Sequence, residues 1–426
     1  MPEPATDADS DTELTPAGLS RPTETNQLKG DTVTQPHTTA RPGRAVLVLA
    51  DGRVFTGVPF GATGTTLGEA VFTTGMTGYQ ETMTDPSYHR QIVATTAPQI
   101  GNTGWNDEDD ESRGDRIWVA GLVIRDLSAT VSSWRASGTL EEAMVEQGVV
   151  GIRGVDTRSL VRHLRNHGSI AAGIFSGADA EAPREELVDK VRSQPAMAGA
   201  DLAREVSTDE VYEVPAEGEE RFTVVAYDMG IKSNTPRHLA RRGMHTVVVP
   251  ANTPYKDIEK YHADGVFISN GPGDPATADE MVEVTRDVIR AHVPLFGICF
   301  GNQILGRALG LETYKLKFGH RGLNVPVINH DTRRIHITSQ NHGFALKGEP
   351  GQEFDSEFGP ARVTHTCLND DCVEGVALAD GMAFSVQYHP EAAAGPHDAG
   401  EMFDRFVELM EKHSPNRGDN DREDTK

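Results

Sequence analysis

A cysteine with a nearby glycine on either side is the residue in this sequence best suited to covalent chemistry. The segment 297–301 reads GICFG. It stands where the apolar run 294–298 ends and a helical pattern at 302–310 begins. Glycines beside a nucleophile permit the tight turn that lifts its side chain above a sheet. The start of the helix favours the thiolate of Cys299, and the N–H of Phe300 would face the oxyanion formed by attack on a carbonyl. A buried structural cysteine is the alternative, and this segment alone leaves both open.

A cysteine nucleophile needs a base, and the base needs a partner that orients it. His389 and Glu391 stand on either side of Pro390, directly after an apolar strand pattern. Proline favours an extended conformation for the residue before it, and residues two apart in an extended chain point to the same side. A His-Pro-Glu triplet alone is typical of many loops. In a domain that also contains Cys299, it predicts a catalytic pair.

Two further segments could hold a substrate. The loop 269–275, SNGPGDP, directly follows the apolar residues 265–268, and such loops at the carboxyl ends of strands present free N–H groups. The segment 340–344, QNHGF, combines an amide, exposed backbone and an aromatic ring that could hold an α-amino acid. Taken alone, each segment is equally compatible with a plain turn.

These segments must be positioned by a domain in which strands and helices alternate. From residue 221 the sequence repeats strand, loop and helix, the pattern of an α/β domain with a mostly parallel sheet flanked by helices. Residues 43–200 are mixed α/β, beginning with a strand at 45–49 and a hairpin turn at Asp51-Gly52. The acidic residues 201–220 indicate a linker between a first domain (43–200) and a second domain (221–413). The polar tails, 1–42 and 414–426, are expected to be disordered.

Composition excludes several classes of protein. The net charge of −24 predicts an acidic surface that would repel nucleic acid and anionic membranes. The sequence has no apolar run long enough to span a bilayer, and its first residues lack the features of a secretory signal, so a cytoplasmic protein is expected. Three cysteines in 426 residues argue against a disulfide framework.

Some acidic and metal-ligating residues are given no function. His365, Cys367 and Cys372 lack a fourth ligand at zinc spacing, so no metal site is predicted. The acidic run 107–111 lacks the glycine of a calcium loop and is expected to be a solvated loop.

The motifs SNGPGDP, GICFGNQ, NHGF and HPE, in this order and spacing, resemble those of the class I (triad) glutamine amidotransferases. The resemblance covers essentially all of the second domain. It implies hydrolysis of the side-chain amide of L-glutamine through a cysteinyl thioester, with Cys299 as the nucleophile, His389 as the base and Glu391 as its orienting group. Asn302 is a departure, because many relatives have histidine after the elbow glycine.

The same resemblance implies a set of substrate-binding residues. Gly273 and Phe300 would supply the oxyanion N–H groups. The pocket for glutamine would be lined by Gly271, Gln303, Asn341, Gly343 and Phe344.

The first domain indicates which reaction uses the ammonia. Residues 68–104 and 154–174 are similar to the N-terminal domain of the small subunit of carbamoyl phosphate synthase, and residues 227–234 are also like that subunit. This resemblance places Ser87, in Asp85-Pro86-Ser87-Tyr88, beside the bound glutamine. It implies a glutaminase subunit that delivers ammonia to a large synthetase subunit and so serves arginine and pyrimidine synthesis.

The sequence has no Walker-type phosphate loop and no dinucleotide fingerprint. The resemblance therefore implies no cofactor in this chain. ATP and magnesium are expected on the large subunit, in a heterodimer or a larger oligomer. Two other functions stay open. The chain could be the glutaminase component of another amidotransferase, as in GMP or anthranilate synthesis, which the first domain disfavours. It could also be a non-catalytic regulatory subunit, which an intact Cys, His and Glu disfavour.

Overall fold

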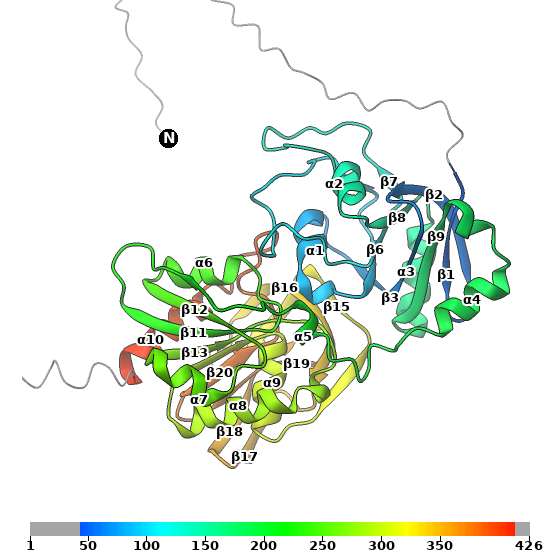
Figure 1. The fold of residues 1–426 in the computed structure, drawn as a ribbon. Helices are drawn as coiled ribbons and strands as arrows, with labels where there is room; N and C mark the ends of the chain where they lie inside the picture. Colours follow the sequence, from blue (N-terminus) through cyan, green and yellow to red (C-terminus); the bar gives the residue numbers. More distant parts are fainter. Residues whose placement is uncertain (1–42, 414–426) are drawn as a thin grey trace, which may run out of the picture. The chain divides into compact units, whose positions relative to one another are not determined.

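The computed structural model describes residues 43–413 (Figure 1). The two tails that the sequence predicts to be disordered, 1–42 and 414–426, lie outside the described residues.

The first domain is built on a closed barrel with the strand order β1-β2-β8-β6-β4-β3-β9. The apolar run 45–49 forms β1, which pairs antiparallel with β2 in the predicted hairpin. The barrel closes because β9 pairs antiparallel with both β1 and β3. Its strands are β1 (Ala45–Leu49), β2 (Val54–Gly61), β3 (Thr65–Thr73), β4 (Gln91–Thr95), β6 (Gly121–Val123), β8 (Val150–Arg153) and β9 (Ile170–Ser176).

Short elements connect and cover these strands. The connection from β3 to β4 contains the helix α1 and the 3₁₀ turn η1, in which Ser87 accepts a hydrogen bond from Asn270 of the second domain. The other elements include α2, whose N-terminus is closed by a capping box between Thr139 and Glu142, and α3, whose N-terminus is capped by the side chain of Asp156. The bounds are α1 (Tyr79–Thr84), η1 (Pro86–Tyr88), β5 (Gln99–Ile100), β7 (Asp126–Leu127), α2 (Leu140–Glu146), α3 (Thr157–His167), η2 (Gly177–Glu181) and α4 (Arg184–Arg192).

The second domain contains one sheet of 11 strands, in which the order β10-β12-β11-β13-β14-β20-β19-β18-β15-β16 forms the main path. The strands β12, β11, β13, β14 and β20 are parallel, and the remaining strands extend the sheet with antiparallel pairs. The bounds are β10 (Tyr212–Val214), β11 (Phe222–Asp228), β12 (Met244–Pro250), β13 (Gly265–Ile268), β14 (Leu295–Ile298), β15 (Thr313–Asn329), β16 (Ile335–Leu346), β17 (Glu353–Ser356), β18 (Gly359–Cys367), β19 (Val373–Leu378) and β20 (Ala383–Val386).

Helices cover both faces of the parallel strands. Side chains alternate along β11, so that Val225 and Tyr227 belong to one buried cluster and Val224 and Ala226 to the other. The first cluster includes residues of α7, α8 and α9, and the second includes residues of α6 and α10 (Figure 1). This three-layer arrangement confirms the predicted α/β fold class. The bounds are α6 (Asn234–Ala240), α7 (Tyr255–Ile258), η3 (Glu259–Tyr261), η4 (Pro275–Thr277), α8 (Asp279–Arg290), α9 (Phe300–Ala308) and α10 (Glu401–His413).

The segment 201–220, which the sequence predicts to be a linker, contains two short elements. Helix α5 spans Ala203–Val206, and strand β10 pairs antiparallel with β12 at the edge of the second domain's sheet. Residues 201–220 thus contribute a strand to the second domain, and the domain boundary itself stays a prediction.

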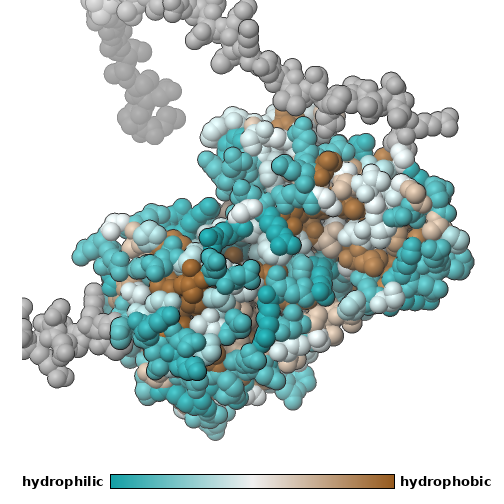
Figure 2. All heavy atoms as spheres, in the orientation of Figure 1, coloured by the Kyte–Doolittle hydropathy of each residue, from teal (hydrophilic) through white to brown (hydrophobic). Residues whose placement is uncertain are grey.

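The surface is largely polar. Figure 2 shows hydrophilic residues over most of the drawn face, with apolar residues in scattered patches. No helix within residues 43–413 is long and apolar enough to cross a membrane.

The acidic run 107–111 corrects one expectation, because its last two residues are not solvated. Asp110 is 7% exposed and accepts a hydrogen bond from Nε2 of Gln80 at 2.9 Å. Glu111 is 2% exposed. The end of the run packs against α1, whereas Asp107 and Glu108 are exposed as predicted, and this division is not encoded in the local composition.

Candidate active site

Cys299 occupies a strained turn between β14 and α9. Its backbone has φ 53° and ψ −98°, outside the regions that non-glycine residues usually adopt. A Cβ at Gly301 would lie 2.2 Å from the carbonyl oxygen of Ile268, and one at Gly297 would lie 2.7 Å from that of Gly301. The two glycines therefore let the turn pack against β13 and against itself, as the sequence predicts for a nucleophile elbow.

The thiol of Cys299 points into the protein. The side chain is 2% exposed, and Sγ lies 3.7 Å from the carbonyl oxygen of Asn341, to which the thiol can donate. Phe300 is the first residue of α9, so its N–H has no intrahelical partner. A free N–H next to a buried sulfur is the arrangement required to stabilise an oxyanion.

His389 and Glu391 form a buried pair. Nδ1 of His389 lies 2.7 Å from Oε1 of Glu391, and both side chains are fully buried. Because a carboxylate only accepts, Nδ1 carries the proton and Nε2 is left for other chemistry. Within the described residues Nε2 has no hydrogen-bond partner. The extended spacing that the sequence predicts for these two residues thus brings them into contact.

The charges around His389 favour its protonated form. Burial and the nearby Lys232 lower the pKa of His389, but Glu391 and Cys299 outweigh them and raise it to about 10. Burial raises the pKa of Glu391, whereas His389 and Lys232 lower it, so that its net shift is downward and the carboxyl is ionised. The pair is therefore an imidazolium-carboxylate ion pair at neutral pH.

The structure gathers the predicted substrate residues around one pocket next to the sulfur. Met197, Arg321 and Lys315 also line it, and Lys315 forms an ion pair with Glu69 at the rim. Phe300 itself is buried behind Cys299. The predicted residues that line the pocket are Ser87, Gly271, Gly273, Cys299, Gln303, Asn341, Gly343 and Phe344.

Two glycines of the loop 269–275 are required by close packing. A Cβ at Gly271 would lie 2.1 Å from the carbonyl oxygen of Met229. Gly273 has φ 97°, and a Cβ there would lie 2.7 Å from the carbonyl oxygen of Ala200. Glycine at both positions allows the loop to bring its bare backbone to the pocket.

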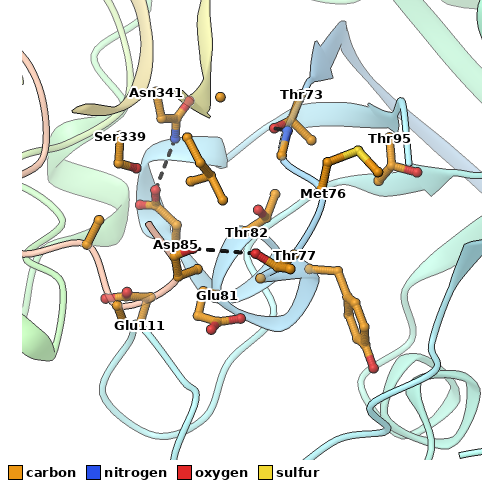
Figure 3. Close-up of a pocket in the computed structure, with 18 of the residues that line it drawn as sticks. Thr73, Met76, Thr77, Glu81, Thr82, Asp85, Thr95, Glu111, Ser339 and Asn341 are labelled. Carbon is orange, nitrogen blue, oxygen red and sulfur yellow. Dashed lines mark hydrogen bonds between the residues drawn. The ribbon is translucent and has the colours of Figure 1, made fainter. Parts of the chain in front are cut away.

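The first domain contributes directly to this pocket. Asp85 caps the 3₁₀ turn η1 by accepting from the N–H of Ser87 at 2.9 Å. Oγ of Ser87 accepts from Nδ2 of Asn270 at 3.0 Å, and Oδ2 of Asp85 accepts from Nδ2 of Asn341 at 3.0 Å. Figure 3 shows the contact between Asp85 and Asn341. The two domains therefore position one another's pocket residues.

Lys232 neutralises a buried cluster of carboxylates at this junction. Its Nζ lies 3.4 Å from Oδ2 of Asp85, and the lysine is 6% exposed. Burial lowers the pKa of Lys232, but Asp85, Glu111 and Glu391 raise it well above its usual value. Burial raises the pKa of Glu111 to about 7. Lys232 thus interacts electrostatically both with Asp85 of the first domain and with Glu391 of the second.

A second pocket lies on this side of the junction. Asp85, Glu111 and Lys232 line it together with the residues that follow Glu391, and Figure 3 shows Glu81 and Glu111 with their carboxyl groups in the same region as Asp85. Asn341 lines both pockets. Burial raises the pKa of Glu81 to about 7. The first pocket is lined by Cys299, and the second is lined by Ala392, which directly follows Glu391.

Sequence reasoning gave no role to several residues that the structure places here. Asp85, Asn270 and Lys232 were visible only as parts of longer motifs, and Arg321 was not singled out at all. A buried arginine or lysine is rare, but burial is not visible in one sequence. Asn302, the departure from the family pattern, is fully buried and donates from Nδ2 to Oε1 of Gln387 at 3.2 Å. It joins α9 to the segment after β20 and does not line either pocket.

Replacing Asp85 by Asn is expected to raise the KM for glutamine about ten- to hundredfold. The cap on η1 can survive, but the ion pair with Lys232 and the acceptor for Asn341 are lost, and a hydrogen bond to a charged group contributes about 1.5–3 kcal/mol. Steady-state glutaminase kinetics would measure this change.

Asp156→Asn is the matched control, because Asp156 also caps a helix through its side chain, at Ser159 of α3. If both variants alter thermal stability equally and neither changes KM, Asp85 has only a structural role.

Comparisons with known proteins agree with this geometry. A family model described as "Carbamoyl-phosphate synthase small chain, CPSase domain" matches residues 47–174, and one described as "Glutamine amidotransferase class-I" matches residues 225–409. The carbamoyl phosphate synthase small chain of Corynebacterium glutamicum is 71% identical over 374 residues, which cover 88% of this chain and 95% of that protein. The protein of the same name from Mycolicibacterium paratuberculosis is 67% identical over 369 residues, covering 87% and 99%.

The second domain, with its strained cysteine and its matched family model, is that of a class I glutamine amidotransferase. The first domain then identifies the particular family within this class. The chain belongs to the carbamoyl phosphate synthase small chain family, and it is the glutaminase subunit that supplies ammonia.

Proposed function

We propose that Cys299, His389 and Glu391 carry out glutamine hydrolysis as a catalytic triad. The observation that carries this proposal is the buried pair of His389 and Glu391. Nε2 of His389 has no hydrogen-bond partner among the described residues, and the nearby Cys299 helps to raise the pKa of this histidine. An imidazolium next to the sulfur stabilises a thiolate, which is the nucleophilic form of cysteine.

The reaction runs in two halves. The thiolate of Cys299 attacks the side-chain amide carbon of L-glutamine, and the N–H groups of Phe300 and Gly273 stabilise the resulting oxyanion. Nε2–H of His389 then protonates the amide nitrogen, the C–N bond breaks and ammonia leaves a thioester. The now neutral imidazole removes a proton from water, which attacks the thioester carbon. The C–S bond breaks, glutamate is released, and the Cys299 thiolate and the His389 imidazolium are restored.

The remaining pocket residues bind the α-amino and α-carboxylate groups of glutamine. Ser87, Gly271, Gln303, Gly343 and Phe344 fit this role because they line the cavity that contains Sγ of Cys299. Nε2 of Gln303 already donates to the carbonyl oxygen of Phe344 at 2.8 Å, which fixes the side chain and directs its other amide atom. Asn341 joins this set through its contact with Asp85.

Ammonia passes to a large synthetase subunit that binds ATP, magnesium and bicarbonate, in a heterodimer or a larger assembly. Membership of the small chain family supports this partner. The absence of a phosphate loop from the sequence supports nucleotide binding elsewhere. Glutamine is the substrate, and the strong negative charge disfavours nucleic acid as a partner.

A glutamine analogue with an electrophilic carbon at the amide position is expected to label Cys299 alone. Cys367 and Cys372 are also buried, and burial raises the pKa of the Cys367 thiol to about 12, so that it is not a thiolate at neutral pH. Peptide mass spectrometry after labelling identifies the modified residue, and excess glutamine should protect it.

Labelling that falls equally on all three cysteines, or that glutamine does not slow, would contradict the assigned nucleophile. If the protein is labelled specifically at Cys299 but does not hydrolyse glutamine, the pocket binds glutamine and the proposed catalytic triad is wrong.

A further inference from the structure

Three buried polar atoms converge next to the glutamine pocket, which one of the three residues, His342, also lines. They are Nδ1 of His320 on β15, Nε2 of His342 on β16 and Oε1 of Glu374 on β19, and all three lie within 4.8 Å of one another. None has a hydrogen-bond partner among residues 43–413. Buried polar atoms without partners are costly, so three that face one another indicate a missing central group.

The other polar atom of each side chain is already fixed. Nε2 of His320 contacts Oδ2 of Asp370 at 2.8 Å, and Oε2 of Glu374 accepts from Nε2 of Gln340 at 2.8 Å. Nδ1 of His342 lies 2.8 Å from the carbonyl oxygen two residues further along β16, so Nδ1 must carry its proton. Outer partners of this kind, a carboxylate or carbonyl on the second nitrogen of each histidine, orient the ligands of metal sites.

The separations suit a small tetrahedral cation. Oε1 of Glu374 lies 3.5 Å from Nδ1 of His320 and 3.7 Å from Nε2 of His342. Zinc bonds of about 2.0–2.2 Å to nitrogen and oxygen place neighbouring ligands of a tetrahedron about 3.4 Å apart. Three such ligands leave a fourth position for water. Histidine nitrogen with a carboxylate oxygen is a donor set that zinc and its neighbouring transition metals accept.

We propose that His320, His342 and Glu374 bind one divalent transition-metal ion of the zinc class. The ion would join three strands of the second domain, β15, β16 and β19, next to the pocket that His342 also lines. His342 stands between Asn341 and Gly343, which line that pocket, so the ion would hold β16 in the position that places them. Its role is structural, and no step of glutamine hydrolysis passes through it.

A second grouping of possible ligands shares His320. His320, Cys367 and Asp370 also bring ligand atoms within 4.8 Å of one another. We favour the first grouping, because Nε2 of His320 and Asp370 already satisfy each other, whereas the three ligand atoms of the first grouping have no hydrogen-bond partner among the described residues. Replacement of Cys367 therefore distinguishes the two sites.

The test is metal binding by the purified full-length chain after treatment with a chelator. One equivalent of Zn²⁺ or Co²⁺ is expected to bind, measured by atomic emission, and to raise the thermal midpoint. Co²⁺ should give the visible absorption of a four-coordinate ion. Glu374→Gln and His320→Asn should each lose this binding, and Asp370→Asn should weaken it about ten- to hundredfold, the usual effect of removing an outer partner.

Two variants serve as controls. Cys367→Ala should bind as the parent does, and so should His245→Asn, which removes an exposed histidine that lies beside Glu213 and Glu220. The proposal is overturned if parent and Glu374→Gln bind equally, because the metal then lies elsewhere, or if Cys367→Ala abolishes binding. It is also overturned if no metal binds and the chelator leaves the thermal midpoint unchanged, since a proton then fills the cluster.

Discussion

Cys299→Ser is expected to abolish glutamine-dependent carbamoyl phosphate synthesis while ammonia-dependent synthesis by the complex continues. A serine hydroxyl in the same turn is not ionised at neutral pH, and it cannot form with His389 the charge pair that the thiolate of Cys299 forms. Loss of the nucleophile from a comparable triad lowers kcat roughly 10⁴-fold or more. The measurement is the rate of carbamoyl phosphate formation by the reconstituted complex, with glutamine or with ammonium as the nitrogen source.

Cys367→Ser makes the same chemical change at another buried cysteine and is the control. It should leave both rates close to those of the parent. If Cys299→Ser lost the ammonia-dependent rate as well, the fault would lie in assembly or folding. If it kept the glutamine-dependent rate, Cys299 would not be the nucleophile.

The sequence could predict those parts of the site that are local in the chain. Cys299 is marked by its own flanking glycines, and His389 and Glu391 are close enough for an extended chain to bring them together. The β1–β2 hairpin and the parallel strands around β11 follow from short-range patterns in the same way. In each case the residues that decide the structure lie within a few positions of one another.

The remaining features depend on contacts between distant segments. Lys232 is an ordinary polar residue in the sequence, and only the approach of Asp85 from the other domain makes it a buried counter-ion. Glu111 is buried against α1 although its acidic neighbours predict a solvated loop. His320 and Glu374 come from strands on either side of β18, so no spacing rule for metal ligands could have paired them.

His389→Asn is expected to lower the kcat of glutamine hydrolysis about 10²- to 10⁴-fold, the range that positioned acid–base groups contribute. The variant removes the proton donor for ammonia, the base for water and the cation that stabilises the thiolate. Because asparagine is smaller and neutral, it also leaves Glu391 as a buried carboxylate whose nearest remaining cation is Lys232. Ammonia-dependent synthesis should remain, which shows that the variant assembles with the large subunit.

The pH profile separates a catalytic histidine from a structural one. The pKa of His389 is raised to about 10, so its imidazolium is present throughout the neutral range and is lost only as the pH rises through about 10. In the parent, the rate constant of thioester formation should therefore fall as the pH rises through about 10, because the imidazolium that protonates the leaving ammonia is lost there. Single-turnover measurements of thioester formation should show this alkaline limb in the parent and not in His389→Asn. If His389→Asn still shows the alkaline fall in rate, or keeps kcat within tenfold of the parent, another group carries out the proton transfers.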